Sequence, residues 1–430
     1  MAAVGEGAGP VPGGSPSRPG SVPVVVATIL RERGCTGVHT HVRQFMRYLD
    51  AHGVPAHLVT PSSAEPLASA AVSAVRLPFG HLNGSLSVLW YRHWHEVFLR
   101  RALRRHLEGL GEAVVYAQGP LEARAALATR AGPHQRVVMA VHFHTSQAEE
   151  WADKRYITRR GTVYRDIAML ERTTLPAVDG LVYVSEAARE ALLHWLPEAG
   201  AVPSAVIPNF VDPPVEVPAP GRLGDLVTVG GLENYKNHRF LLDVLGEAGR
   251  LGRSLTLDIY GEGPCRRELE HRARALGIEA QVRLRGFVAD ARAHLPAYRA
   301  YVHASPKETG PLAVIEAMAA GLPVVAGEYG GVPELVRAGV EGRFWPLEDP
   351  AKAAAVLLEL LDSEEACADA SRAARARYAG HYRADILAPR LWSFLMGDAP
   401  AVAPAPAPEP ETRRPAPVGG ATLVLPPLAP

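Results

Sequence analysis

Short apolar runs and helical patterns alternate along most of this chain. From residue 23, an apolar run of strand length leads into a loop with two glycines, and apolar residues then recur at helical spacing. The helical positions are Val42, Phe45, Met46 and Leu49, and Gly53 is placed to end the helix. Further apolar runs lie at 56–59, 113–117, 137–142 and 180–184. Strands that alternate with helices predict a parallel sheet covered on both faces.

A proline-rich stretch at 207–221 interrupts this alternation and indicates a linker between domains. A second series of the same kind follows it. Its strands are expected at 225–231, 255–260, 281–284, 300–304 and 323–326, with helices between them. The pattern therefore predicts an α/β protein with two doubly wound halves that face a cleft. In such sheets ligands bind beyond the carboxyl ends of the strands, so we expect the chemistry in the loops that follow strands.

Composition indicates where the domains begin and end. We expect a first domain at 21–212, a linker at 213–222, a second domain at 223–380 and a final helical stretch at 381–396. Residues 1–20 and 397–430 are rich in Gly, Pro, Ser and Ala, which is the composition of disordered tails. Both tails are therefore left out of the predicted fold.

Charge and cysteine content narrow the class of protein. The 45 basic and 45 acidic residues balance, so no global positive field points to nucleic acid as a partner. Cys35, Cys265 and Cys367 are far apart and lack C-x-x-C spacing, which favours a reducing compartment and no structural zinc. The longest apolar run, 22–30, is too short to cross a bilayer, and no signal peptide is visible. We expect a cytoplasmic protein.

The segment 305–334 carries the most information about function. Glu308 and Glu316 flank seven residues that turn a loop into a helix. We expect Pro311 to be the first helical residue, because its missing N–H needs no partner there. The free N–H groups at this helix start form an anion site suited to a diphosphate, and Gly310 lets the ligand approach closely.

The two glutamates are expected to bind different parts of one ligand. Glu316 lies one turn after Leu312 on the same flank of the helix, so its carboxylate can accept the hydroxyls of a ribose beyond the phosphates. Glu308, before the helix, is left to hold a sugar. The alternative is an ordinary amphipathic helix with two solvated charges. A glycine stop at Gly321, a buried strand and a second glycine loop at 330–331 argue against that alternative.

With these elements, the segment resembles the signature of glycosyltransferase family 4, whose members are retaining enzymes of the GT-B fold. In that family, the E-x7-E element and the G-x-P-E loop after it hold a nucleoside-diphosphate sugar. The resemblance covers roughly residues 23–396 and is specific between 260 and 349. It implies two Rossmann-like domains around a central cleft, the first binding the acceptor and the second the nucleotide sugar. It also implies that the helix at 381–396 crosses back to the first domain.

The resemblance assigns roles to individual residues. The motif FHTS, after the strand at 137–142, implies that His144 approaches the transferred sugar, so His144 and Glu308 are the expected catalytic residues. His142, two residues earlier, is expected to be structural. Val288 corresponds to the loop that contacts the nucleobase. The expected donor-binding residues are Gly37, Lys236, Val288, Thr309, Gly310, Pro311, Leu312 and Glu316.

One departure from the family pattern lies in VGGLENYKNH, residues 229–238. Lys236 matches the lysine that neutralises the diphosphate, but Gly231 stands where the family has an arginine. An arginine would bind two phosphate oxygens with a fork that lysine lacks. The residues that could replace it are Arg33, which we rank first, and Arg31 and Arg239.

The loop GEGP at 261–264 follows a predicted strand and opens a predicted helix. It superficially resembles a dinucleotide fingerprint. It lacks the third glycine and a suitable acidic residue about twenty positions later, so an NAD site is not expected.

The stretch 90–111 combines aromatic and basic side chains on one predicted helix. The basic residues are Arg100, Arg101, Arg104 and Arg105, and the apolar ones are Trp90, Trp94, Phe98 and Leu99. Such a helix can rest on an anionic membrane as a peripheral contact. The alternative is a surface helix whose apolar stripe packs on the sheet.

The expected activity is that of a retaining glycosyltransferase, which moves a sugar from a nucleoside-diphosphate donor to an acceptor hydroxyl. UDP-sugars are the commonest donors in the resembled family and GDP-sugars come next, so we expect a UDP-sugar. The acceptor is left open among a small natural product, a lipid and a polysaccharide. No metal or cofactor is expected, because no D-x-D pair resembles a metal clamp and Lys236 with the helix start can stabilise the leaving diphosphate.

Three alternatives stay open. A nucleotide-sugar epimerase shares the GT-B architecture but needs no acceptor. A phosphorylase of the glycogen type would need a lysine-bound pyridoxal cofactor, and no motif suggests one. A non-catalytic partner subunit is suggested by Gly231 and by the proline-rich tail.

Overall fold

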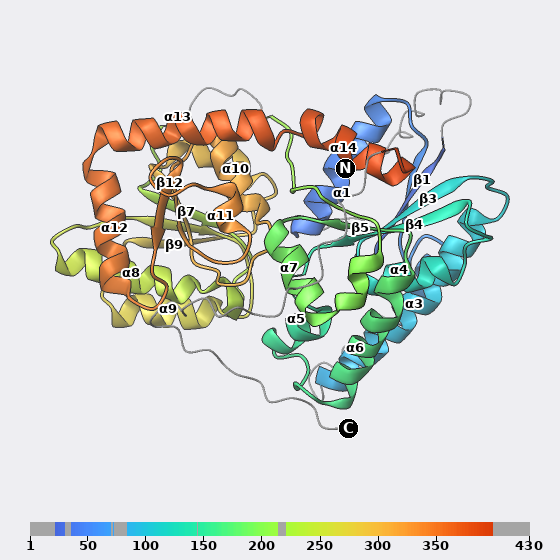
Figure 1. The fold of residues 1–430 in the computed structure, drawn as a ribbon. Coiled ribbons are helices and arrows are strands. Elements are labelled where there is room, and N and C mark those ends of the chain that lie inside the picture. Colours follow the sequence, from blue (N-terminus) through green and yellow to red (C-terminus); the bar gives the residue numbers. More distant parts are fainter. Residues whose placement is uncertain are drawn as a thin grey trace, which may run out of the picture.

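The computed structural model describes residues 22–30, 36–69, 72, 84–143, 145–213 and 221–398 (Figure 1). The predicted disordered tails lie outside these residues, apart from the first two positions of the second tail. Four residues named above also lie outside them, and these are Arg31, Arg33, Cys35 and His144. The expectations for these positions stay predictions.

The first sheet is built from strands that precede the proline-rich stretch. It has six parallel strands in the order β2-β1-β3-β4-β5-β6. Their bounds are β1 Val24–Ala27, β2 Ala56–Val59, β3 Ala113–Ala117, β4 Gln135–Val141, β5 Gly180–Tyr183 and β6 Ser204–Val206. The five strands predicted here are confirmed. β6 was not predicted, because its three residues are too few to form a recognisable apolar run.

The second sheet also has six parallel strands, in the order β12-β11-β10-β7-β8-β9. Their bounds are β7 Leu226–Val229, β8 Leu257–Tyr260, β9 Val282–Gly286, β10 Ala300–His303, β11 Val324–Gly327 and β12 Gly342–Trp345. The predicted α/β class with two doubly wound halves is therefore confirmed.

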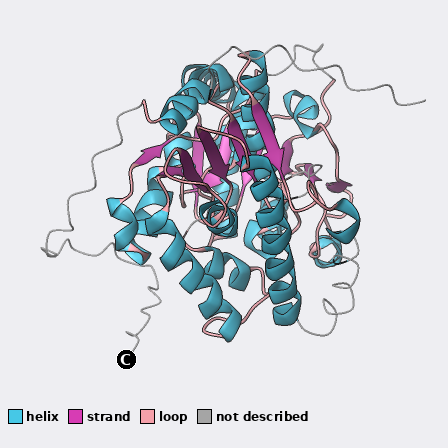
Figure 2. Ribbon diagram, turned by 90° about the vertical axis from the view of Figure 1, so that its right-hand side faces the viewer, coloured by secondary structure: helices cyan, strands magenta, loops and turns pink. Residues whose placement is uncertain are grey.

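Helices cover both faces of each sheet (Figure 2). Around the first sheet they are α1 Gly37–Ala51, α3 Gly84–Leu107, α4 Pro120–Leu127, α5 Gln147–Asp153, α6 Thr162–Thr174 and α7 Glu186–Trp195. The later helices are α8 His238–Arg250, α9 Arg266–Ala275, α10 Leu312–Ala320, α11 Val332–Leu335, α12 Pro350–Asp362, α13 Glu364–His381 and α14 Ala384–Met396. Short 3-10 helices are η1 Leu175–Ala177, η2 Pro197–Ala201, η3 Asn234–Lys236 and η4 Ala291–Ala297. The helix expected between β9 and β10 is only η4, since Pro296 inside it lacks an N–H.

Burial in β1 shows why the strand is apolar throughout. Successive side chains of a strand point to opposite faces of the sheet. Val24 and Val26 belong to the core cluster that contains α1, whereas Val25 and Ala27 belong to the cluster that contains α3. Because both faces are covered, all four residues are buried.

The last helix returns to the first sheet, as the resemblance implied. α13 runs along the second domain, and α14 then lies against α1 and β3 of the first (Figure 1). Leu387 and Phe394 of α14 are buried in the same core cluster as Phe45 of α1. The predicted crossing of the final helix is confirmed.

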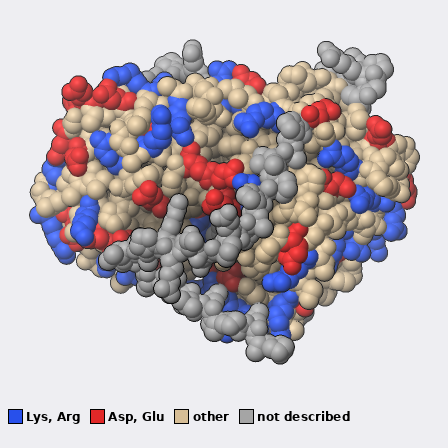
Figure 3. Space-filling model, in the orientation of Figure 1, with Lys and Arg blue, Asp and Glu red and all other residues tan. Residues whose placement is uncertain are grey.

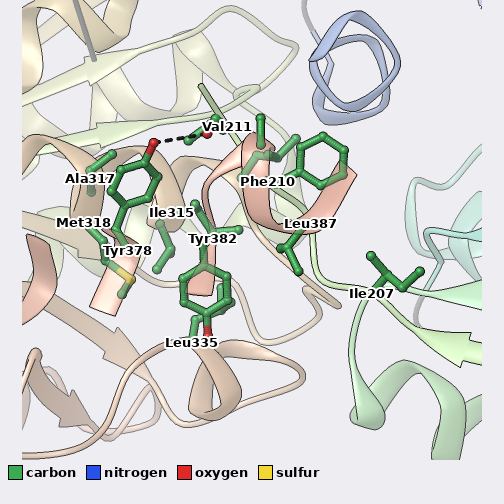
Figure 4. Close-up of a cluster of buried hydrophobic side chains, with 14 of the residues drawn as sticks. Ile207, Phe210, Val211, Ile315, Ala317, Met318, Leu335, Tyr378, Tyr382 and Leu387 are labelled. Atoms are coloured by element: carbon green, nitrogen blue, oxygen red, sulfur yellow. Dashed lines mark hydrogen bonds between the residues drawn. The ribbon is translucent and has the colours of Figure 1, made fainter. Parts of the chain in front are cut away.

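The chain passes from the first sheet towards the second beside α14. Val211 forms a parallel bridge with Arg383, and its carbonyl accepts a 3.1 Å hydrogen bond from the Tyr378 hydroxyl (Figure 4). Ile207, Phe210 and Val211 are buried in the same cluster. The proline-rich stretch therefore begins as packed chain rather than as a free linker. The predicted domain boundaries themselves stay a prediction.

The helix with aromatic and basic residues, α3, packs its apolar side chains inward. Phe98 and Leu99 are buried, whereas Arg101 and Arg105 lie on the surface, where both approach Glu65. Part of the stripe therefore packs on the sheet as the alternative expects, while Leu86 and Leu89 of the same helix are 50% and 39% exposed. The membrane contact stays a prediction. Acidic and basic side chains lie near one another over both halves of the face in Figure 3. In the described part of the chain, no helix is long and apolar enough to cross a membrane.

We expect the α14 contact to be a main source of stability for the first domain. Leu387→Ala removes a side chain that is 1% exposed, so it should cost about 3 kcal/mol and lower Tm by roughly 5–10 °C. Ile386→Ala, next to it but 37% exposed, is the control and should change Tm far less. Thermal unfolding of the two variants tests this. Equal losses would show that α14 does not hold the first domain through this face.

Candidate functional site

The helix start after β10 is the centre of the candidate site. α10 begins at Leu312, so the prediction that Pro311 would be its first residue was wrong by one position. Pro311 has a helical φ of −65° but an extended ψ of 110°, and its carbonyl accepts the N–H of Val314 at 3.1 Å. It therefore caps the helix. Among the described residues, the N–H groups of Leu312 and Ala313 have no acceptor, as an anion site requires.

Glu308 and Lys236 meet in an ion pair beside this helix start. The two residues are 72 positions apart in the chain, and both side chains are mostly buried. Lys236 ends η3 in the loop after β7. A Cβ added at Gly230 would lie 3.7 Å from Lys236 Cε, so the lysine lies against the Gly230–Gly231 backbone. The predicted diphosphate lysine and the predicted sugar-binding glutamate are thus brought together.

Two histidines that were not predicted lie close to this pair. Burial lowers the pKa of His238 to about 3 and the pKa of His303 to about 4, and the charge of Lys236 contributes to both. Both imidazoles are therefore neutral near pH 7. The two neutral rings therefore add no positive charge beside the Lys236–Glu308 pair. No motif in the sequence could have indicated this, since it follows from burial.

The first domain holds the loop before α10 in place. The Thr309 hydroxyl donates to the carbonyl of His142 at 2.9 Å, and Asn209 Nδ2 donates to the carbonyl of Gly310 at 2.7 Å. A Cβ at Gly310 would lie 3.3 Å from the carbonyl oxygen of Val184, which explains the glycine. Asn209 was not predicted, because it lies in the stretch interpreted as a linker.

Gly37 also meets this loop from the first domain. It is the first residue of α1, and a Cβ added to it would lie 3.5 Å from Leu312 Cδ1. Two expected donor-binding residues from opposite domains are therefore neighbours at the start of α10. His142 is buried, which lowers its pKa to about 4, and its Nε2 lies 3.1 Å from Gln118 Oε1. The structural role expected for His142 stays a prediction.

The glycine loop at 330–331 packs on the backbone of the loop that precedes α10. The N–H of Gly331 donates to the carbonyl of Glu308 at 2.8 Å, and a Cβ at Gly331 would lie 1.9 Å from Thr309 O. Glu334, at the end of this loop, accepts the N–H groups of Glu186 and Ala187 at 2.8 Å each. Its carboxylate therefore caps the start of α7 in the opposite domain, a role that the sequence did not predict.

The GEGP loop also serves backbone packing. A Cβ at Gly261 would lie 1.9 Å from the carbonyl oxygen of Gly230, and a Cβ at Gly263 would lie 2.5 Å from that of Leu232. Both glycines allow the loops after β7 and β8 to touch. Within the described residues, no three His, Cys, Asp or Glu side chains gather closely enough to hold a metal ion.

Glu316 and Val288 lie at the other end of the site. Burial raises the pKa of Glu316 to about 7, and Asp290 adds to this while Arg292 opposes it. Glu316 makes no hydrogen bond or ion pair within the part of the chain that is described. Val288, two residues before Asp290, is half-buried against the core cluster that contains Leu312. The loop after β9 and the flank of α10 thus adjoin.

We expect the buried carboxyl of Glu316 to make stability depend on pH. Its pKa is raised from 4.5 to about 7 by folding, so the folded chain holds a proton that the unfolded chain releases. Stability should therefore fall as pH rises from about 4.5 to above 7, by about 3 kcal/mol at most. Glu316→Gln should raise Tm at pH 8 and leave it unchanged at pH 4.5. Tm measured without ligand over this range tests the point, with exposed Glu365→Gln as the control. A Glu316→Gln profile parallel to wild type would contradict it.

Comparison with known proteins gives two family matches and several relatives. The model "Glycosyltransferase Family 4" matches residues 35–214, and the model "Glycosyl transferases group 1" matches residues 224–363. Phosphatidyl-myo-inositol mannosyltransferase of Mycobacterium leprae is 28% identical over 76% of this chain and 84% of that protein. The putative colanic acid biosynthesis glycosyltransferase WcaL of Salmonella typhimurium is 30% identical over 33% of this chain, and the match spans only 37% of that protein.

Solved structures share the fold. Sucrose-phosphate synthase from Thermosynechococcus elongatus has a TM-score of 0.67 at 16% identity, over 88% of this chain and 100% of that one. Anabaena HepE, in complex with UDP-glucose, has a TM-score of 0.61 at 18% identity, over 87% of this chain and 99% of that one. The chain belongs to the family 4, group 1 glycosyltransferases, and it is an enzyme of the glycosyltransferase class with the two-domain GT-B fold.

Proposed function

We propose that the protein is a retaining glycosyltransferase that transfers a sugar from a nucleoside-diphosphate sugar to the hydroxyl of an acceptor. The observation that carries this proposal is the convergence at the start of α10. Unpaired N–H groups, the Lys236–Glu308 pair and Gly37 of the opposite domain all meet there. The arrangement offers an anion a helix start and a lysine, and it offers a sugar hydroxyl a carboxylate.

The leaving diphosphate accumulates the largest charge in this reaction. The N–H groups of Leu312 and Ala313 would donate to it, and Lys236 would neutralise part of it, which is how preorganised dipoles stabilise a transition state. The proposed assignment uses no metal ion. Pro311 supports it by fixing the chain just before the free N–H groups.

Glu308 and His144 are proposed to hold the transferred sugar rather than attack it. Retention would then follow from departure and attack on the same face, with the leaving phosphate taking the acceptor proton. Glu316 is proposed to bind the ribose. With a pKa of about 7, its carboxyl can both donate and accept hydrogen bonds near neutral pH. Val288 is proposed to line the nucleobase site.

The donor is proposed to be a UDP-sugar. Among proteins of the same fold, Anabaena HepE was solved with UDP-glucose and pneumococcal GtfA with UDP and GlcNAc. The acceptor class is narrowed no further than a natural product, a lipid or a polysaccharide. Relatives named for phosphatidyl-myo-inositol and for colanic acid biosynthesis are in keeping with the last two. A cytoplasmic location, with a peripheral membrane contact through residues 90–111, completes the proposal.

Three substitutions test the assigned roles. Glu308→Ala and His144→Ala should lower transfer at least 100-fold while Tm stays close to wild type, because each removes a contact to the reacting sugar. Glu316→Ala should mainly raise KM for the donor. Steady-state kinetics with the donor and acceptor measure both effects. Glu365→Ala, an exposed glutamate of α13, is the matched control and should keep normal turnover. Normal turnover in all three site variants would show that these residues do not have the proposed roles.

Donor identity can be tested without the acceptor. A ligand at about 100 times its Kd stabilises the native state by about 2.7 kcal/mol. In a thermal-shift screen of UDP-, GDP-, ADP- and dTDP-sugars, a UDP-sugar should give the largest rise in Tm. Product analysis then separates transfer from epimerisation, since an epimerase releases altered sugar without acceptor. A chain that binds none of the four would be a non-catalytic partner.

A further inference from the structure

The loop after β7 carries fewer positive charges than the family pattern provides for a diphosphate. Gly231 stands where the family has an arginine, and nothing around it forbids a side chain. A Cβ there would be 3.7 Å from its nearest neighbours, Glu233 Oε1 and Glu262 O. The loop itself therefore brings one cation, Lys236, which already pairs with Glu308.

The other basic side chains near the site already contact other groups. Arg239 is exposed and lies 3.8 Å from Glu268 of α9. Arg292 donates to the carbonyl of Asp212 at 2.8 Å and lies towards Glu316 instead. Lys307 pairs with Asp153 at 2.6 Å. Arg31 and Arg33 lie outside the described residues.

Lys154 reaches this loop from the opposite domain. It follows the last residue of α5, and its Nζ lies 5.7 Å from the centre of the Tyr235 ring. Lys236 Nζ lies 5.2 Å from the centre of the same ring. One aromatic ring, three residues before His238, is therefore shared by two ammonium groups, one from each domain.

Glu233 lies beside Gly231 and also acts on the charge of Lys154. Burial lowers the pKa of Lys154, but the carboxylates of Glu150 and Glu233 outweigh this, so the pKa lies above its ordinary value and the amine stays charged. Glu233 is the residue whose Oε1 lies 3.7 Å from the Cβ position of Gly231. An arginine side chain at 231 and the ammonium of Lys154 would thus share the carboxylate of Glu233 as a neighbouring charge.

We propose that Lys154 supplies, from the first domain, the second positive charge for the donor diphosphate that Gly231 does not provide. The proposal rests on the function proposed above. Lys154 now pairs with Glu150 at 2.8 Å, and Glu150 is 40% exposed. The Lys154 side chain is 27% exposed, so the pair is partly open to water, and ion pairs of this kind one helical turn apart are weak enough for a diphosphate to replace. Because the ligand would then bind both domains, donor binding also draws the domains together.

A lysine and an arginine would differ here in geometry. Lysine binds phosphate as a point charge, whereas arginine binds two oxygens at once. The Tyr235 ring and Glu150 orient the flexible lysine side chain before the ligand arrives. The alternative role is purely structural, with Lys154 holding α5 against the second domain. The two roles differ in whether the phosphates of the ligand matter.

The test is the Kd for UDP and GDP, with uridine and guanosine as probes that lack phosphates, measured by calorimetry on the full chain. Lys154→Met should weaken the binding of UDP, or of GDP if that is the nucleotide bound, at least tenfold, because a charge-assisted contact is lost. Binding of the matching nucleoside should change less than twofold. Lys154→Arg, which keeps the charge, should stay within threefold of wild type. Asp153→Asn breaks the neighbouring ion pair between the domains and should also stay within threefold.

A second variant separates a lost charge from perturbed folding, because a cation at another position can restore only the charge. Gly231→Arg in the Lys154→Met background should restore nucleotide affinity to within threefold of wild type, since it returns a cation beside Glu233. Equal weakening of nucleotide and nucleoside, equal weakening in Asp153→Asn, or unchanged UDP and GDP affinity in Lys154→Met would each overturn the inference. If wild type binds neither UDP nor GDP, the proposed function fails first and this inference falls with it.

Discussion

The two unpaired N–H groups at the start of α10 are the feature on which the rest of the site depends. A helix leaves its first N–H groups without partners, and a protein can cap them, expose them to water or present them to a ligand. Here Pro311 turns the chain into the helix without supplying a side-chain cap. The helix behind it is almost wholly buried, so its position is set by packing against β10 and β11. The anion site is therefore rigid, although it consists only of backbone.

The position of this helix start relative to the first domain is the second requirement. Three polar contacts set it, from Asn209 to Gly310, from Thr309 to His142 and from Glu334 to the start of α7. Each uses a backbone group of one domain, so each depends on the local course of the chain rather than on a flexible side-chain pair. The return of α14 to the first sheet adds an apolar contact far from the site. A ligand bound between the domains would thus meet a loop that both domains hold.

Charge in the site is balanced by burial as much as by pairing. His238 and His303 are neutral because they are buried, and Glu316 is easily protonated for the same reason. Two lysines nearby form ion pairs with carboxylates, Lys236 with Glu308 and Lys154 with Glu150. A diphosphate can compete for both lysines. In its proposed role, Lys154 of the opposite domain would supply the positive charge that Gly231 does not provide.

The sequence by itself determined the class of fold, most of the strands and most of the helices, because these depend on apolar residues that are neighbours in the chain. β2 and β3 were predicted to the residue. Motif spacing and the family resemblance also singled out Glu308, Lys236 and Glu316, whose roles stay predictions. Only the tertiary structure decided that α10 starts at Leu312, that Lys236 pairs with Glu308, and that Asn209, Glu334 and Lys154 reach across the domains. Contacts between residues 70 to 170 positions apart depend on how two sheets pack. No local pattern of apolar and polar positions carries that information.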